Sequence, residues 1–157
     1  MISPLSSSRF LITLSILVSN RQVRPSCLSD MLRPSMQTLK HIHIVMDIHD
    51  DVDDYSNPLF SIPSEFEDMR TKNSIETVII EVHMDANNHG GGDWCRFDEV
   101  FTTPGWFSLK RVSLCINYWI VNNELERVLR NSPETQFPRL SSSNSVSFDC
   151  KVISNFK

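Results

Sequence analysis

The residues with the greatest chemical potential lie in one stretch, HIHIVMDIHDDVDD, which covers residues 41–54. Histidines and aspartates of this kind can bind a metal ion or act as general acids and bases. In one interpretation, His41 and His43 project from the same side of a strand and ligate zinc with a third group such as Asp47 or His83. In the other, Ile42 and its apolar neighbours are the buried residues, and the histidines lie on the solvated face of the strand.

We favour the solvated face, because a metal site needs oriented ligands with supporting partners and the sequence shows neither. The aspartates do not form a calcium-binding loop, since Asp51-x-Asp53-x-Tyr55 is not followed by glycine and the twelfth position is Ile62. We therefore expect an exposed acidic loop, no metal and no cofactor.

A glycine run at residues 89–92, His-Gly-Gly-Gly, has the sequence of an oxyanion-hole motif found in some lipases. The chain contains no G-x-S-x-G nucleophile motif, and the glycines lack the Lys-Ser/Thr of a phosphate loop. We expect a connection that leads into a helix capped by Asp93. Because each constellation lacks an essential partner, the sequence predicts no enzyme; the alternative is a metal-dependent hydrolase that uses His41, His43 and His83.

Length and composition favour one folded domain. The chain has 157 residues, 40% of them hydrophobic, and a formal net charge of −4. We expect a single domain over residues 1–157, with residues 1–9 disordered. The Lys and Arg residues are dispersed along the chain, so nucleic acid is not expected as a partner.

The four cysteines lie far apart, without a CxxC pair. We interpret them as reduced core thiols, with a disulfide in a secreted protein as the alternative. Residues 10–18 are apolar and follow Arg9, like the start of a signal peptide, but they lack a cleavage site and are too short to span a membrane. We therefore expect a cytoplasmic or nuclear protein that does not enter a membrane, with secretion as the less favoured reading.

A repeated apolar pattern organises the chain. An apolar residue, another three positions later and a third two positions after that recur in Leu11-Leu14-Ile16, Leu39-Ile42-Ile44, Ile75-Val78-Ile80 and Leu109-Val112-Leu114. The last two positions have the period of a half-buried strand, and residues 146–152 form a weaker fifth copy. The pattern predicts strands centred on Ile12, Ile42, Val78, Val112 and Phe148.

The segments between these strands have helical spacing at 25–39, 63–70, 94–101 and 123–130. DDVDDYSNP, NNHGGGD and SPETQFPRLSSS are expected to be connecting loops. Helical crossovers join parallel strands and are right-handed, so the predicted fold is α/β, a βα solenoid with a parallel sheet of about five strands. Its expected core contains Leu14, Ile16, Ile44, Ile80, Leu114 and Phe97.

One unit of the repeat carries a recognisable motif. Trp94, Phe97, Asp98 and Phe101 are followed by Phe107, Leu109, Lys110, Val112 and Leu114. This unit resembles the W-x-x-L-D-x-x-L…F-x-x-L-K-x-V-x-I unit of fungal F-box and leucine-rich-repeat-like proteins. The resemblance extends over residues 10–153 mainly through the strand pattern, and the copies lack the asparagine that regular leucine-rich repeats place after the strand.

The resemblance implies a leucine-rich-repeat-like scaffold that binds other proteins, and in full-length relatives a ubiquitin-ligase substrate receptor. The helices of an F-box need some forty residues, and the segment before Phe10 is too short to hold them. We therefore do not expect binding to the ligase adaptor. A substrate-recognition fragment of an F-box receptor is the alternative.

The expected binding surface is the sheet face that the helices leave open. Equivalent outward positions of neighbouring parallel strands form rows across such a face. These positions are Thr13 and Ser15, His41 and His43, Thr77 and Ile79, and Arg111 and Ser113. The rows are polar without strong charge, which favours a protein or peptide partner over nucleic acid or lipid. Among the tryptophans, Trp94 is expected in the core, whereas Tyr118 and Trp119 must point to opposite sides.

Overall fold

The computed structural model describes residues 13–19, 28–48, 58–84, 94–119 and 123–155, with the backbone alone for 13–19, 58, 60 and 125. The strands are β1 (Thr13–Ser19), β2 (His41–Ile48), β3 (Thr77–Met84), β4 (Arg111–Tyr118) and β5 (Ser147–Ser154). The helices are α1 (Leu28–Leu32), the 3-10 turn η1 (Arg33–Ser35), α2 (Pro58–Met69), α3 (Trp94–Thr102), α4 (Asn123–Arg130), α5 (Ser132–Thr135) and α6 (Pro138–Ser141).

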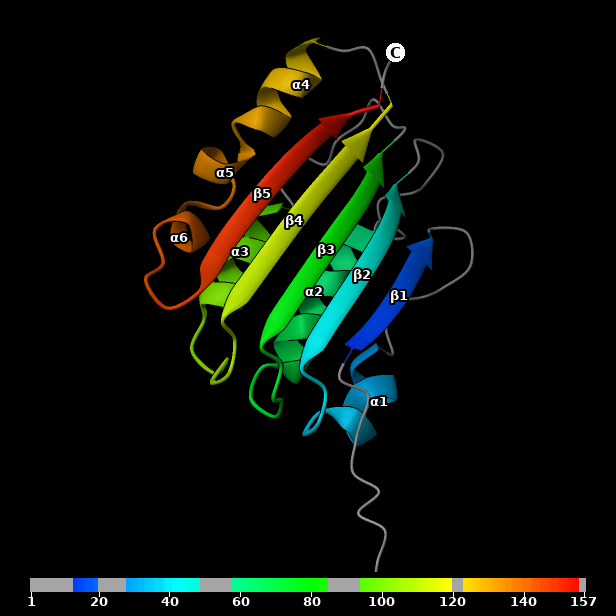
Figure 1. Cartoon of the computed structure of the whole chain (residues 1–157), viewed down its shortest axis with the longest axis vertical. Helices are drawn as coiled ribbons and strands as arrows, with labels where there is room; N and C mark the ends of the chain where they lie inside the picture. Colours follow the sequence, from blue (N-terminus) through cyan, green and yellow to red (C-terminus); the bar gives the residue numbers. More distant parts are fainter. Residues whose placement is uncertain (1–12, 20–27, 49–57, 85–93, 120–122, 156–157) are drawn as a thin grey trace, which may run out of the picture.

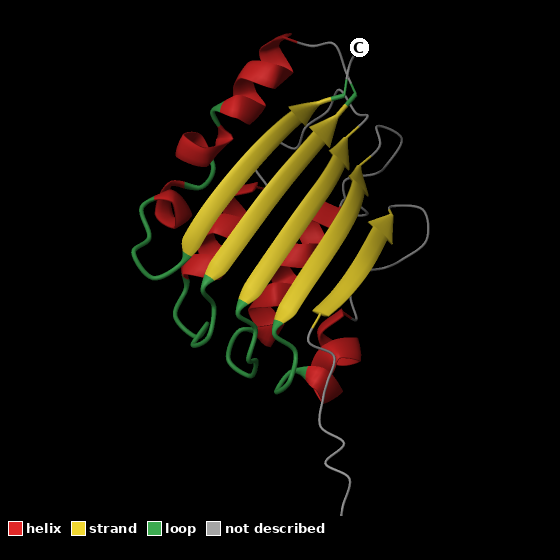
Figure 2. Ribbon diagram, in the orientation of Figure 1, coloured by secondary structure: helices red, strands yellow, loops and turns green. Residues whose placement is uncertain are grey.

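The five strands form one parallel sheet in the order β1-β2-β3-β4-β5, so each strand pairs with its neighbours in sequence. Helices α2 and α3 lie behind the sheet in the view of Figure 1, and none of the described helices covers the opposite face. The sheet is open and only gently twisted (Figure 2). The predicted α/β class with a parallel sheet is therefore confirmed.

The repeated apolar pattern and the sheet register agree. Leu14 pairs with Ile42, which in turn pairs with Val78 and then Val112, so equivalent positions of the copies lie side by side. The predicted strand centres are nevertheless wrong. Four of them are the second residues of their strands: Ile42, Val78, Val112 and Phe148. The fifth, Ile12, lies outside the described residues. The apolar pattern predicts where the strands begin. It does not predict where they end, because the strands continue through polar residues such as Asp47.

The core lies between the sheet and the helices. Residues alternate between buried and partly exposed along β2, β3 and β4, as expected for strands with one covered face. The predicted core residues Ile44, Ile80, Leu114 and Phe97 are all buried. The side chains of Leu14 and Ile16 lie outside the described part of the chain.

The helix predictions hold for α4, which spans 123–130 as expected, and for α3, which ends one residue later than expected. Helix α2 begins at Pro58 rather than at 63, so Pro63 lies inside it instead of at its start. Within the described part of the predicted stretch 25–39, α1 and η1 cover Leu28–Ser35, so the helical part ends at Ser35 rather than at 39.

One predicted loop is wrong. SPETQFPRLSSS contains the two short helices α5 and α6. They form because Phe137 and Leu140, 2% and 1% exposed, pack into the core against the end of the sheet. Phe137 lies 5.1 Å from Phe148 and 6.4 Å from Trp94, measured between ring centroids.

Two buried carboxylates tie helices of neighbouring units together. Asp98 on α3 is 4% exposed and accepts hydrogen bonds from the backbone amides of Leu140 at 2.8 Å and Arg139 at 3.2 Å. Glu65 on α2 accepts one from the amide of Ser29 at 2.8 Å. Amides in the first turn of a helix have no partner within that helix, so these carboxylates satisfy them from an adjacent helix.

The cysteine prediction is partly wrong. Cys95 is exposed on α3, and Cys115 lies partly exposed on the open side of the sheet. Cys95 points outward because it follows the inward Trp94 on α3. Of the three described cysteines, Cys150 alone faces the helices from the sheet, and it is partly buried against the core.

The tryptophan predictions are confirmed. Trp94 is buried in the core, while Tyr118 and Trp119 point to opposite sides with exposures of 1% and 46%. Several other predictions fall outside the described residues: the disordered segment 1–9, Cys27, the acidic loop after residue 49, and the glycine connection with Asp93. In the described part of the chain, no helix is long and apolar enough to cross a membrane.

Candidate binding face

The open face is the side of the sheet without helices, and it presents every second residue of each strand. The strand register places the predicted binding residues in two adjacent rows. The first row is Thr13, His41, Thr77 and Arg111, and the second is Ser15, His43, Ile79 and Ser113. For Thr13 and Ser15 the register fixes the backbone position only. Arg111 and Ile79 are exposed, and the other described members are partly exposed.

Arg111 is held by a residue that sequence reasoning missed. Its Nε and Nη2 donate to Asp149 Oδ2 at 3.0 and 2.8 Å, and the Ser113 hydroxyl donates to Asp149 Oδ1 at 2.6 Å. Asp149 belongs to the weak fifth copy of the repeat, and it pairs in register with Ser113. Extending the predicted rows to that fifth copy would have found it.

The richest chemistry of the open face lies further along the strands, around Glu81. His83 Nε2 is 2.8 Å from Glu81 Oε1, and His43 Nε2 is 3.3 Å from Glu81 Oε2. Asn117 donates its amide to Glu81 Oε1 at 3.3 Å, and His83 Nδ1 lies 3.3 Å from Asp47 Oδ1. We call His43, Asp47, Glu81, His83 and Asn117 the Glu81 cluster.

The cluster stays accessible to solvent. The side chains of His43, Asp47, Glu81 and His83 are 31%, 27%, 33% and 35% exposed. The hydrogen bond from His83 lowers the pKa of Glu81 below its ordinary value, against a smaller opposing effect of burial. Glu81 is therefore an ionised carboxylate at neutral pH.

Sequence reasoning had considered His43, Asp47 and His83 but not Glu81, their common partner. Glu81 stands two residues before His83 on β3 and opposite Val45 on β2. The signal was available, because charged residues at alternating positions on one strand project from the same face. The contact itself depends on the register between β2 and β3.

The geometry does not assemble the three histidines of the alternative hydrolase. His83 pairs in register with Asp47, six residues along β2 from His41, a separation of about 20 Å. Among the described residues, no group of three or more His, Cys, Asp or Glu side chains could hold a metal ion.

Trp119 extends the open face beyond the end of β4. Its ring packs edge-on against His83, with centroids 5.5 Å apart. A half-exposed tryptophan beside charged groups is typical of residues that contribute most to protein interfaces.

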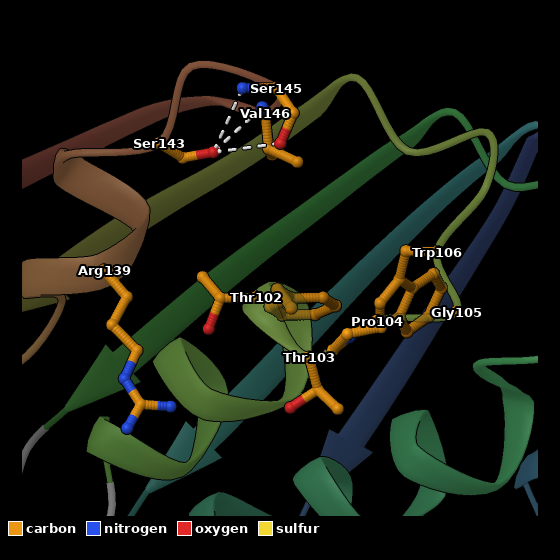
Figure 3. Close-up of a pocket in the computed structure, with 10 residues that line it drawn as sticks. Thr102, Thr103, Pro104, Gly105, Trp106, Arg139, Ser143, Ser145 and Val146 are labelled. Atoms are coloured by element: carbon orange, nitrogen blue, oxygen red, sulfur yellow. Dashed lines mark hydrogen bonds between the residues drawn. The ribbon is translucent and has the colours of Figure 1, made fainter.

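A separate cavity of about 240 Å³ lies where α3 ends (Figure 3). Its hydroxyl groups are already used: Thr102 and Thr103 donate to the backbone carbonyls of Asp98 and Glu99, and Ser143 accepts from the amide of Val146. The cavity wall brings together no acid, base or nucleophile arranged for catalysis.

No protein-family model, curated protein or solved structure matches the chain.

Proposed function

We propose that the protein is a non-enzymatic interaction scaffold that binds a protein or peptide on the open face of a short leucine-rich-repeat-like solenoid. The observation that carries this proposal is a five-strand parallel sheet with helices on one face and ordered rows of accessible side chains on the other. A parallel sheet usually has both faces covered, so an open face calls for an explanation.

The strand order supports the solenoid part of the proposal. Every strand lies next to its neighbours in sequence, and the copies of the apolar pattern pair in register. In repeat proteins each unit contacts its neighbours in this way, and the extended surface that results serves recognition. The buried Asp98 gives the aspartate of the repeat motif a structural role, since it holds the following α6.

The chemistry of the face supports a protein or peptide partner. Its described charges are mixed, and the guanidinium of Arg111 is occupied by Asp149. Ile79 adds an apolar side chain, 37% exposed, within the second row. A phosphate backbone would need several cations in a row, which the described face does not present.

The test uses a double variant, Thr77→Lys with Ile79→Lys. Both residues are accessible on the open face, and neither makes an ion pair that the substitutions would break. Immobilised wild-type protein should capture a defined set of proteins from cells of its source organism. The double variant should lose them, because two lysines would crowd the centre of the face.

A matched control is Gln37→Lys with Asn144→Lys. These residues are exposed in the turns before β2 and β5, away from the open face, and the control adds the same charge. Circular dichroism should show both variants folded. Capture that is identical for the face variant and the control would contradict the proposal.

A further inference from the structure

We propose that the Glu81 cluster together with Trp119 is a subsite that binds an arginine side chain of the partner. This inference rests on the proposed function of the open face and names the chemistry of its partner. Of its residues, His43 belongs to the second row of predicted binding residues, and Asp47, Glu81, His83, Asn117 and Trp119 lie outside both rows.

The negative charge of the cluster favours a cationic ligand. The open face around the cluster carries the carboxylates of Asp47 and Glu81. With the histidines counted as neutral, the cluster has a charge of about −2, and the whole chain is at −4. The other described polar and charged groups near it on the open face of β4 and β5 are Cys115, Asp149 and Lys151. Asp149 is engaged by Arg111, so Lys151 is the single described cation of these strands that could offset the cluster.

The carboxylates of Asp47 and Glu81 can accept further hydrogen bonds. A carboxylate offers about four acceptor positions. Among the described residues, the side chain of Asp47 has one contact, from its Oδ1 to His83 at 3.3 Å. Of the side chains that the structure describes, His43 alone reaches Glu81 Oε2, also at the long distance of 3.3 Å. Both groups keep free acceptor positions for the forked donors of a guanidinium.

The ring of Trp119 favours arginine over lysine as the ligand. Its indole is 46% exposed and stands against His83, at the edge of the cluster. A planar guanidinium can stack on an aromatic ring while it donates to a carboxylate, whereas an ammonium is a compact, strongly hydrated charge. An aromatic ring that packs against His83, the histidine in contact with both partly satisfied carboxylates, therefore fits arginine.

The test is a titration with the peptide acetyl-Gly-Arg-Gly-amide, followed by NMR of the tryptophan indole N–H signals. The signal of Trp119 should shift, with a Kd on the order of 1 mM for a single side chain, and the signal of the buried Trp94 should not. The neutral peptide acetyl-Gly-Gln-Gly-amide should cause no shift. The lysine peptide should bind more weakly than the arginine peptide.

Asp47→Asn should raise the Kd about two- to fivefold, the effect of losing one partly exposed ion pair. Trp119→Leu removes the indole signal, so its titration is followed by the imidazole signals of His83, and it should raise the Kd by a similar factor through loss of the cation–π contact. The control is Glu134→Gln, which removes one charge from an exposed position on α5. It should change the Kd less than about twofold, since it lies away from the sheet face. Equal shifts with the glutamine peptide, an unchanged Kd in both cluster variants, or an equal loss in the control would overturn the inference.

These outcomes separate the inference from the proposed function. If the Thr77→Lys, Ile79→Lys variant loses its partners but the arginine peptide does not bind, the open face stands and the arginine subsite is refuted. If the peptide binds at Trp119 but the face variant keeps all its partners, the subsite stands and the wider face is refuted.

Discussion

Removing the buried carboxylate of Asp98 should destabilise the fold more than any change on the open face. Asp98 is 4% exposed and satisfies the amides of Arg139 and Leu140 at the start of α6. In Asp98→Ala both amides lose their acceptor, and that of Leu140 is buried away from water. In Asp98→Asn one side-chain oxygen can still accept a hydrogen bond. The NH2 group that replaces the other oxygen would lie against a backbone N–H, so two donors would face each other.

The size of the effect follows from these contacts. Hydrogen bonds to a charged group contribute about 1.5–3 kcal/mol each, and the cost of burying the carboxylate offsets part of this. Asp98→Ala should therefore lower the free energy of unfolding by about 2–4 kcal/mol, and Asp98→Asn by about 1–2 kcal/mol. For a chain of this length the alanine variant should melt about 5–12 °C lower.

Urea denaturation followed by circular dichroism measures this loss of stability. If the slope of the unfolding free energy against urea concentration is the same as in the wild type, the two proteins expose the same surface on unfolding and their free energies can be compared. The control is Asp68→Ala on α2, an exposed aspartate that should change the stability by less than about 0.5 kcal/mol. If Asp98→Ala matched this control, the role of Asp98 in holding α6 would be refuted.

Three further predictions concern other parts of the molecule. Burial raises the pKa of the Cys150 thiol to about 11, so its thiolate fraction at pH 8 is about one part in a thousand. Iodoacetamide should then modify the exposed Cys95 first, as peptide mass spectrometry can show; equal rates would refute the burial of Cys150. The lowered pKa of Glu81 contributes stability above the ordinary value of 4.5 that is lost as the pH falls through the lower folded value. In NMR titrations His83→Gln should move the Glu81 midpoint upward, and no movement would show that His83 is not the cause. Gly105 has φ 127°, and a Cβ there would lie 2.9 Å from Arg70 Cγ, so Gly105→Ala should cost about 1–3 kcal/mol in urea denaturation. An alanine variant as stable as wild type would refute the strain at this turn.

The strand pattern was readable from the sequence because it reflects burial directly. Pairs such as Ile42 and Ile44 recur in each copy, and the same positions meet in the sheet. Once the strands are taken as parallel and in order, the rows of the open face follow from alternation alone. This is why His43 and Ser113 could be placed in one row.

What the sequence did not reveal depended on contacts between distant segments. Helices α5 and α6 rest on two buried residues, Phe137 and Leu140, within a segment rich in Ser and Pro that has no helical period. Pro63 suggested a helix start, yet α2 begins at Pro58, and packing of Phe66 and its neighbours outweighs the lost hydrogen bond. The role of Asp98 likewise requires knowing that α6 lies beside α3.

The candidate site shows the same limit. Glu81 meets His43 only because β2 and β3 are aligned so that Val45 lies opposite Glu81. A shift of that register by two residues would keep the same faces and the same burial, but it would break the cluster. Periodicity predicts which face a residue occupies, and the register decides which residues meet.

The most direct test of the open face as a binding surface uses its own histidines. His41, His43 and His83 all lie on this face, whereas Cys95 is exposed on the helical side. The protein, alone and with its captured partner, would be treated with diethyl pyrocarbonate and iodoacetamide and mapped by mass spectrometry. We expect the bound partner to slow modification of at least His43 and His83 and to leave the labelling of Cys95 unchanged. Unchanged histidine labelling together with protection of Cys95 would contradict it and would place the interface on the helices.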